Sequence, residues 1–164
     1  MNIFTDLTGV LLESILLVYF GIVIYYDLKI QKIFNTIMII GFFLGLMYGF
    51  WTNGIESTIL GGIIGFSLMY IVSVIGNVLM PYIAKRRNRY LKNKALYRND
   101  VLFGLISGLI LGKELITSGL FFSLLFFCLV SIIYIFYKII KHEYHPGLSL
   151  PVSPFIIFGI LFVK

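Results

Sequence analysis

Cysteine, proline and charge are all scarce in this chain of 164 residues. It has one cysteine and four prolines, and 12% of its residues are charged, where a soluble domain carries roughly a quarter. A single cysteine excludes an internal disulfide scaffold and any Cys-x-x-Cys pair for zinc. By contrast, 60% of the residues are hydrophobic and the mean hydropathy is +1.02. A small globule could not hide so much apolar surface, so the composition excludes a soluble monomer and a disordered chain.

Long apolar runs indicate membrane-crossing helices, each of which needs roughly 20 mainly apolar residues. Six segments qualify, and the fourth is the weakest because its uncharged part covers only residues 101–112. They are Leu7–Tyr26, Ile33–Trp51, Thr58–Pro81, about Leu96–Gly112, Leu115–Tyr137 and Leu148–Val163. Lys113-Glu114 is expected to supply the turn before the fifth segment. The sequence therefore predicts an all-α, polytopic integral membrane protein with a single transmembrane domain over residues 1–164.

The basic residues predict the orientation of this domain. If the six segments alternate in direction, the loops Asp27–Lys32, Tyr82–Asn99 and Lys138–Gly147 lie on one side and hold 11 of the 13 Lys and Arg residues. The positive-inside rule makes that side cytoplasmic and places both termini outside, in a cell membrane. The basic loop at about 82–99 is expected to orient the chain and to attract anionic lipid rather than to bind nucleic acid.

Carboxylates are rare, and at the edge of a membrane span each one is a candidate functional group. Three of the seven fall towards the predicted cytoplasmic side: Asp27, Asp100 and Glu143. Asp27 ends the first segment and Asp100 begins the fourth, so both are expected at the same membrane depth. A structural interpretation, helix capping or pairing with nearby Lys and Arg, suits Asp100 at a helix N-terminus. It suits Asp27 poorly, because negative charge is unfavourable at a helix C-terminus.

The functional interpretation is an aspartyl protease. Two adjacent carboxylates do not both ionise readily, so they share a proton. The charged carboxylate then acts as general base on a water molecule, while the protonated one polarises the scissile carbonyl. This chemistry needs no metal, no cofactor and no nucleophilic Ser or Cys.

The residues around Asp27 and Asp100 support this interpretation through a resemblance. Asp27 is followed by Lys29, Lys32 and then Ile33-Phe34-Asn35, which resembles the first signature of the type IV prepilin leader peptidases, including archaeal preflagellin peptidases. In that signature an Asp and a basic stretch precede Ile-Pro-Asn, so Phe34 replaces the Pro. The second signature is Gly-x-Gly-Asp; here it reads Tyr97-Arg98-Asn99-Asp100, without either glycine. Near the end, Pro151-Val152-Ser153-Pro154-Phe155 resembles the family's Pro-Phe-Gly-Pro-Phe segment.

The resemblance implies that Asp27 and Asp100 are the catalytic pair, with Asn35 and Asn99 as candidate supporting residues. It implies a pilin-like precursor as partner, with a short basic leader, a Gly before the cut and an apolar helix after it, in pilus biogenesis or protein secretion. Cleavage would occur at the cytoplasmic membrane face. The cysteine-bearing domain associated with N-methylation in larger relatives is absent, so cleavage is expected without that second activity.

Two further interpretations stay open. A catalytically degenerate relative that binds or helps to assemble pilin-like partners predicts Asp27 and Asp100 far apart or separately ion-paired. A transporter would need polar groups at mid-membrane, where this chain is largely apolar. The group His142-Glu143-x-His145 is not expected to bind a metal, because no fourth ligand is evident. The sequence does not determine the substrate or the oligomeric state.

Overall fold

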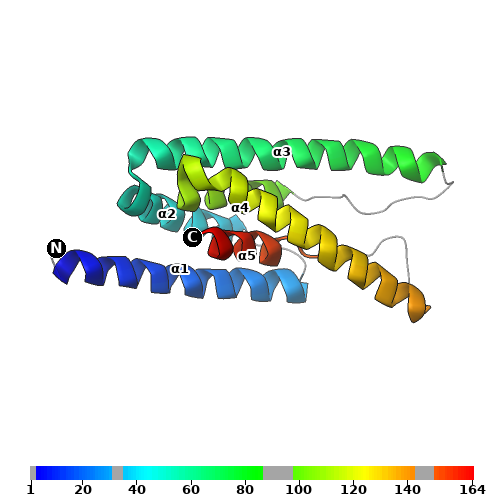
Figure 1. Cartoon of the computed structure of the whole chain (residues 1–164), viewed down its shortest axis with the longest axis horizontal. Coiled ribbons are helices and arrows are strands. Elements are labelled where there is room, and N and C mark those ends of the chain that lie inside the picture. Colours follow the sequence, from blue (N-terminus) through cyan, green and yellow to red (C-terminus); the bar gives the residue numbers. More distant parts are fainter. Residues whose placement is uncertain (1–2, 31–34, 87–97, 143–149) are drawn as a thin grey trace.

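The computed structural model describes residues 3–30, 35–86, 98–142 and 150–164, and all regular elements in these parts of the chain are α-helices. The helices are α1 (Ile3–Ile30), α2 (Asn35–Asn53), α3 (Ile55–Arg86), α4 (Arg98–Ile140) and α5 (Ser153–Val163). The predicted all-α fold class is confirmed. In Figure 1, α1 and α3 run along opposite long edges of the molecule, and α2, α5 and the beginning of α4 lie between them.

Four helices are long and apolar enough to cross a membrane. The crossing candidates are Leu7–Ile30 in α1, Asn35–Asn53 in α2, Ile55–Val78 in α3 and Asn99–Ile140 in α4. Large apolar side chains on them are turned outwards; Val78 is 64% and Ile133 is 68% exposed. Apolar surface of this extent needs an apolar surrounding. The helices and their surfaces are those of a membrane-embedded protein.

The predicted first three segments correspond to α1, α2 and α3, with ends that differ by a few residues. The predicted fourth and fifth segments are joined in α4, and the sixth is represented by α5. The 11 residues of α5 rise only about 17 Å, well short of a hydrocarbon core of roughly 30 Å. The described helices thus support four crossing candidates by length, not the six that the sequence predicts.

A break at Gly112 divides α4 into two arms. Gly112 has φ 71° and ψ 178°, a region of backbone conformation that is essentially restricted to glycine. The predicted turn at Lys113-Glu114 is therefore wrong by one residue, since both of these residues are helical. Two side chains, one at the end of α2 and one in the first turn of α3, bind backbone groups at the break. The Asn53 amide donates to the Ile110 carbonyl at 2.9 Å, and the Lys113 N–H donates to Ser57 Oγ at 3.1 Å.

Contacts around the first arm of α4 show its direction. Gly61 and Gly65 of α3 meet Gly108 and Gly104 of α4 in reverse order, so α3 and this arm are antiparallel. Along α2, Gly41 and Gly49 meet Ile106 and Leu109 in the same order, so α2 and this arm are parallel. At Gly49, Gly61 and Gly65 the backbones of two helices approach where a Cβ atom would intervene, whereas Gly41 makes room for the Tyr19 ring. Glycine packing therefore holds the first arm between α2 and α3.

The second arm of α4 runs in the opposite direction. Its phenylalanines contact α5 in reverse order: Phe127 with Phe155, Phe126 with Phe158 and Phe122 with Phe162, with ring centroids 5.2, 4.5 and 5.0 Å apart. The helix α5 is itself antiparallel to α1, because Ser153 contacts Asp27 while Lys164 contacts Glu13. In turn, α1 is antiparallel to α2, where Tyr48 donates to Glu13 and Gly41 meets Tyr19.

These directions combine into one result. The second arm is antiparallel to α5, which is antiparallel to α1, so the second arm runs in the same direction as α1. Helix α1 is antiparallel to α2, and the first arm is parallel to α2, so the two arms run in opposite directions. The chain therefore reverses at Gly112, and in the described parts of the chain the successive helical segments alternate in direction along the bundle (Figure 1).

Candidate functional site

Burial separates two carboxylates from the others. Side chains are described for five of the seven acids, and only Asp27 and Asp100, which are 6% and 8% exposed, are buried. The other three are exposed: Glu13, Glu56 and Glu114. Burying a charge is expensive unless it is compensated by partners. The two acids selected from the sequence are thus the two described acids whose charged forms need compensating partners.

The helix register places Asp27 and Asp100 at the same level of the bundle. Tyr19, Gly41 and Ile106 meet at one point, where a Cβ atom at Gly41 would lie 3.1 Å from Ile106 Cδ1 and would overlap the Tyr19 ring. From there Asp27 lies eight residues along α1, about 12 Å, and Asp100 lies six residues back along α4, about 9 Å. Both displacements point the same way, so the two residues differ in level by only about 3 Å. Their equal depth in a membrane stays a prediction.

Helices α1 and α4 do not meet directly at this level. No Cα atom of α1 lies within 8 Å of a Cα atom of α4 in the described parts of the chain, and the two helices are joined through α2 and α5. Asp27 and Asp100 are therefore not brought together by direct backbone packing of their two helices.

Asp27 is hydrogen-bonded to the beginning of α5. The backbone N–H of Ser153 donates to Asp27 Oδ2 at 3.1 Å, and the Ser153 hydroxyl donates to the same oxygen. Ser153 is 1% exposed, so both bonds are buried. Asp27 Oδ1 has no hydrogen-bond partner among the described residues. The nearest base in the chain, Lys29, donates instead to the Tyr25 hydroxyl at 2.7 Å.

The first residues of α5 explain why it needs Asp27. The cap residue Val152 has no side-chain acceptor for the free N–H groups of the first turn. Phe155 and Ile156 donate to the Val152 carbonyl, and Pro154 has no N–H. The Ser153 N–H is then the one donor of this turn that still lacks an acceptor, and Asp27 supplies it. The favourable end of the α5 dipole also compensates for the position of Asp27 near the end of α1.

Asp100 occupies the first turn of α4, beside the half-buried Asn99. A carboxylate in that position is favoured by the free amides and the dipole of its own helix. Asn99 is helical, and its φ is not among the positive values of the described residues. The missing glycine at position 99 therefore imposes no backbone strain there. Tyr97, where the other glycine would stand, lies outside the described residues.

The remaining predicted residues have different outcomes. Asn35 is the first residue of α2 and is exposed, whereas Asp27 is buried against α5. Most of the basic loop at about 82–99 lies outside the described residues. Of the group His142-Glu143-x-His145, only the exposed His142, just beyond α4, is described.

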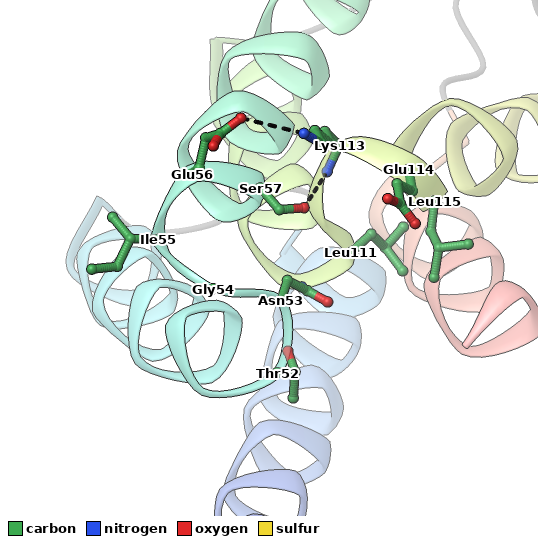
Figure 2. A pocket seen from close by; sticks show the side chains of 10 residues that line it. All are labelled: Thr52, Asn53, Gly54, Ile55, Glu56, Ser57, Leu111, Lys113, Glu114 and Leu115. Atoms are coloured by element: carbon green, nitrogen blue, oxygen red, sulfur yellow. Dashed lines mark hydrogen bonds and ion pairs between the residues drawn. The ribbon is translucent and has the colours of Figure 1, made fainter.

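A separate hollow of about 510 Å³ lies where α2, α3 and the break in α4 meet. Figure 2 shows Lys113 joined by dashed lines to both Glu56 and Ser57 in this hollow, and its ammonium is 3.3 Å from the Glu56 carboxylate. Two of its polar side chains, Asn53 and Ser57, bind backbone groups on either side of Gly112. The polar side chains in this hollow bind one another or the backbone at the break in α4. We therefore do not take this end of the bundle as the candidate site.

Ser153 is the site residue that the sequence analysis did not identify. A local signal for it exists, because Val-Ser-Pro at a helix start leaves one N–H without a local acceptor. That signal does not name the acceptor, which lies 126 positions earlier in the chain.

No family model, no curated protein and no solved structure matches this chain.

Proposed function

We propose that this protein is a membrane-embedded aspartyl endopeptidase that removes the leader peptide from type IV prepilin-like or pseudopilin precursors. The observation that carries the proposal is the selective burial of Asp27 and Asp100 at one level of the bundle. Buried carboxylates in membrane helices are costly and are typical of functional sites. The resemblance of the segments around both residues to the prepilin peptidase signatures supports the same reaction.

In this reaction one carboxylate takes a proton from a water molecule as the water oxygen bonds to the scissile carbonyl carbon. The other carboxyl group, protonated at the start, donates its proton to the carbonyl oxygen. The tetrahedral intermediate then collapses as the carbon–nitrogen bond breaks, its hydroxyl proton returns to a carboxylate, and the leaving amine receives a proton. One water is consumed, and both carboxyl groups regain their starting state. No metal or cofactor takes part.

The location proposed for this chemistry is the cytoplasmic edge of a cell membrane. Six alternating crossings would place the ends of the chain outside and Asp27, Asp100 and most bases inside; the reversal of α4 at Gly112 supports that alternation. A precursor held in the bilayer by its apolar helix would present its leader junction at this depth. Anchoring of this kind raises the effective concentration of the scissile bond without a deep soluble pocket.

The test is cleavage of a co-expressed precursor that has a basic leader, a Gly before the cut and an apolar helix after it. Asp27→Asn and Asp100→Asn each remove a carboxylate that handles protons, so we expect at least about a hundredfold slower leader removal. Loss of the leader is followed by the change in precursor mass. Asparagine retains a carbonyl oxygen that can accept hydrogen bonds from Ser153, so Asp27→Asn preserves the connection to α5.

The matched control is Glu114→Gln, which alters an exposed carboxylate at the other end of the bundle. We expect this variant to cleave as the parent does. Unchanged cleavage in either Asn variant, with the protein present in membranes at the parent level, would show that the protease assignment is wrong.

A second candidate function rests on the contact between Asp27 and Ser153. Asp27 accepts hydrogen bonds from the beginning of α5 and so has a structural role. In a catalytically inactive protein that binds or helps to assemble pilin-like partners, this structural role would be the only role of Asp27. In that case the parent chain co-purifies with the precursor but leaves its leader in place. Asp27→Asn, which retains an acceptor, would then bind the precursor as the parent does.

A further inference from the structure

We propose that Ser153 is a positioning residue for Asp27, which makes α5 part of the catalytic apparatus rather than only a packing element. This inference rests on the proposed protease function and adds to it a residue that the resemblance does not supply. The starting observation is that both donors of Ser153 converge on one oxygen of Asp27, Oδ2.

Two bonds to one oxygen constrain the whole carboxyl group. The N–H of Ser153 can only donate, so Oδ2 must accept and a proton on Asp27 is carried by Oδ1. The bonds also limit rotation of the side chain, because both donors are part of a buried helix start. Oδ1 is therefore the atom that exchanges a proton with the reacting water, while Oδ2 holds the orientation.

The rest of α5 is fixed in a way that supports this role. At its other end the Lys164 ammonium lies 2.9 Å from the Glu13 carboxylate and 4.1 Å from the centre of the Tyr48 ring. Between the ends, Gly159 packs so closely on α4 that a Cβ atom there would lie 3.0 Å from Ser123 Cβ. With contacts at both ends and in the middle, α5 has little freedom to slide along α1. Its first residue thus stays in register with Asp27.

The test compares Ser153→Ala, Ser153→Thr and a matched control, Ser123→Ala. Ser123 is another buried serine at the α5 interface. Its hydroxyl donates to the Gly119 carbonyl at 2.7 Å, with a longer contact of 3.5 Å to the Ile156 carbonyl of α5, and neither acceptor belongs to Asp27. We expect Ser153→Ala to lower kcat roughly ten- to hundredfold with little change in KM, the effect of losing one hydrogen bond to a carboxylate. Ser153→Thr retains the hydroxyl and should restore most of kcat. Ser123→Ala should keep the parent kcat.

A measurement that does not depend on cleavage accompanies the kinetics. The shifts in Tm caused by Asp27→Ala and Ser153→Ala should be smaller in the double variant than their sum, because each substitution removes the same contact. This cycle also shows whether each variant folds.

The outcomes separate the two proposals. If the parent cleaves the precursor and Ser153→Ala has the parent kcat, or Ser153→Thr fails to restore it, the positioning role is wrong while the protease function stands. Additive Tm shifts would likewise overturn the positioning role. If the parent chain does not cleave at all, the proposed function itself is wrong, whatever the thermal cycle shows.

Discussion

Gly112 lies where the chain reverses, and its backbone angles are ones that a residue with a Cβ atom rarely adopts. Its surroundings impose a second restriction, since a Cβ atom there would lie 2.7 Å from Ser57 Oγ and 3.1 Å from Asn53 Cγ. The same two side chains bind the backbone on either side of the break. At the scale of the residue, conformation and close packing both require glycine at this position.

This requirement predicts that Gly112→Ala destabilises the protein through strain and overlap together. The strained backbone costs about 1–3 kcal/mol, and crowding a packed site costs a similar amount again. The lowering of Tm in detergent checks it. Gly54→Ala is the matched control, because Gly54 also has a positive φ, 79°, but has open space around it. An effect of Gly112→Ala no larger than that of Gly54→Ala would contradict the prediction.

Helices α3 and α4 approach closely enough for backbone contact along a row of glycines. Gly61 and Gly65 face Gly104 and Gly108, and a Cβ atom at Gly108 would lie 2.6 Å from the carbonyl carbon of Gly61. Small residues at this spacing allow close helix packing in membranes, where no hydrophobic force draws helices together. The glycine pattern of α3 thus acts at the scale of the element, by bringing the first arm of α4 against it.

We predict that Gly108→Ala separates α3 from α4 and lowers stability by about 1–3 kcal/mol, the usual cost of overpacking. Gly21→Ala is the control: Gly21 lies within α1 with nothing near its Cβ position, so alanine there should be neutral or stabilise the helix by up to about 1 kcal/mol. Unfolding in detergent followed by circular dichroism measures both variants. Equal Tm values for the two would show that the glycine contact is not needed.

The whole molecule has distinct charged ends. Glu13, Glu56, Lys113, Glu114 and Lys164 gather at the end where α2 meets α3 and where both chain termini lie (Figure 1). At the opposite end, Lys29 and Lys138 lie in the last turns of α1 and α4, and Lys141 follows α4 directly. Bases collect on the cytoplasmic side of membrane proteins, which assigns that second end to the cytoplasm in our proposal.

Cysteine labelling tests this orientation. In a Cys128→Ser background, Glu114→Cys should react with a membrane-impermeant maleimide in intact cells. Lys141→Cys should react only after the cells are permeabilised. Both positions are exposed in the structure, so access to the reagent depends on the side of the membrane. The reverse pattern would invert the proposed topology, and labelling of both in intact cells would contradict alternating crossings.

Composition and the order of charges along the chain were enough to predict the class of protein, the helical character of the described segments and the placement of Asp27 and Asp100 near helix ends. These properties are local in the sequence. A run of apolar residues predicts a helix in lipid, and an acid at the end of such a run is recognised without knowledge of the fold. The glycines of the third segment likewise indicate close packing before any fold is known.

The tertiary structure alone decided where the chain reverses and what Asp27 binds. The break lies at Gly112 rather than at Lys113-Glu114 because Asn53 and Ser57, more than fifty positions earlier, bind the backbone groups on either side of it. Asp27, unfavourable at the end of its own helix, is compensated by the beginning of α5, 126 positions away. Unpaired backbone donors and acceptors must find partners in space, and distance along the sequence does not reveal which residues will supply them.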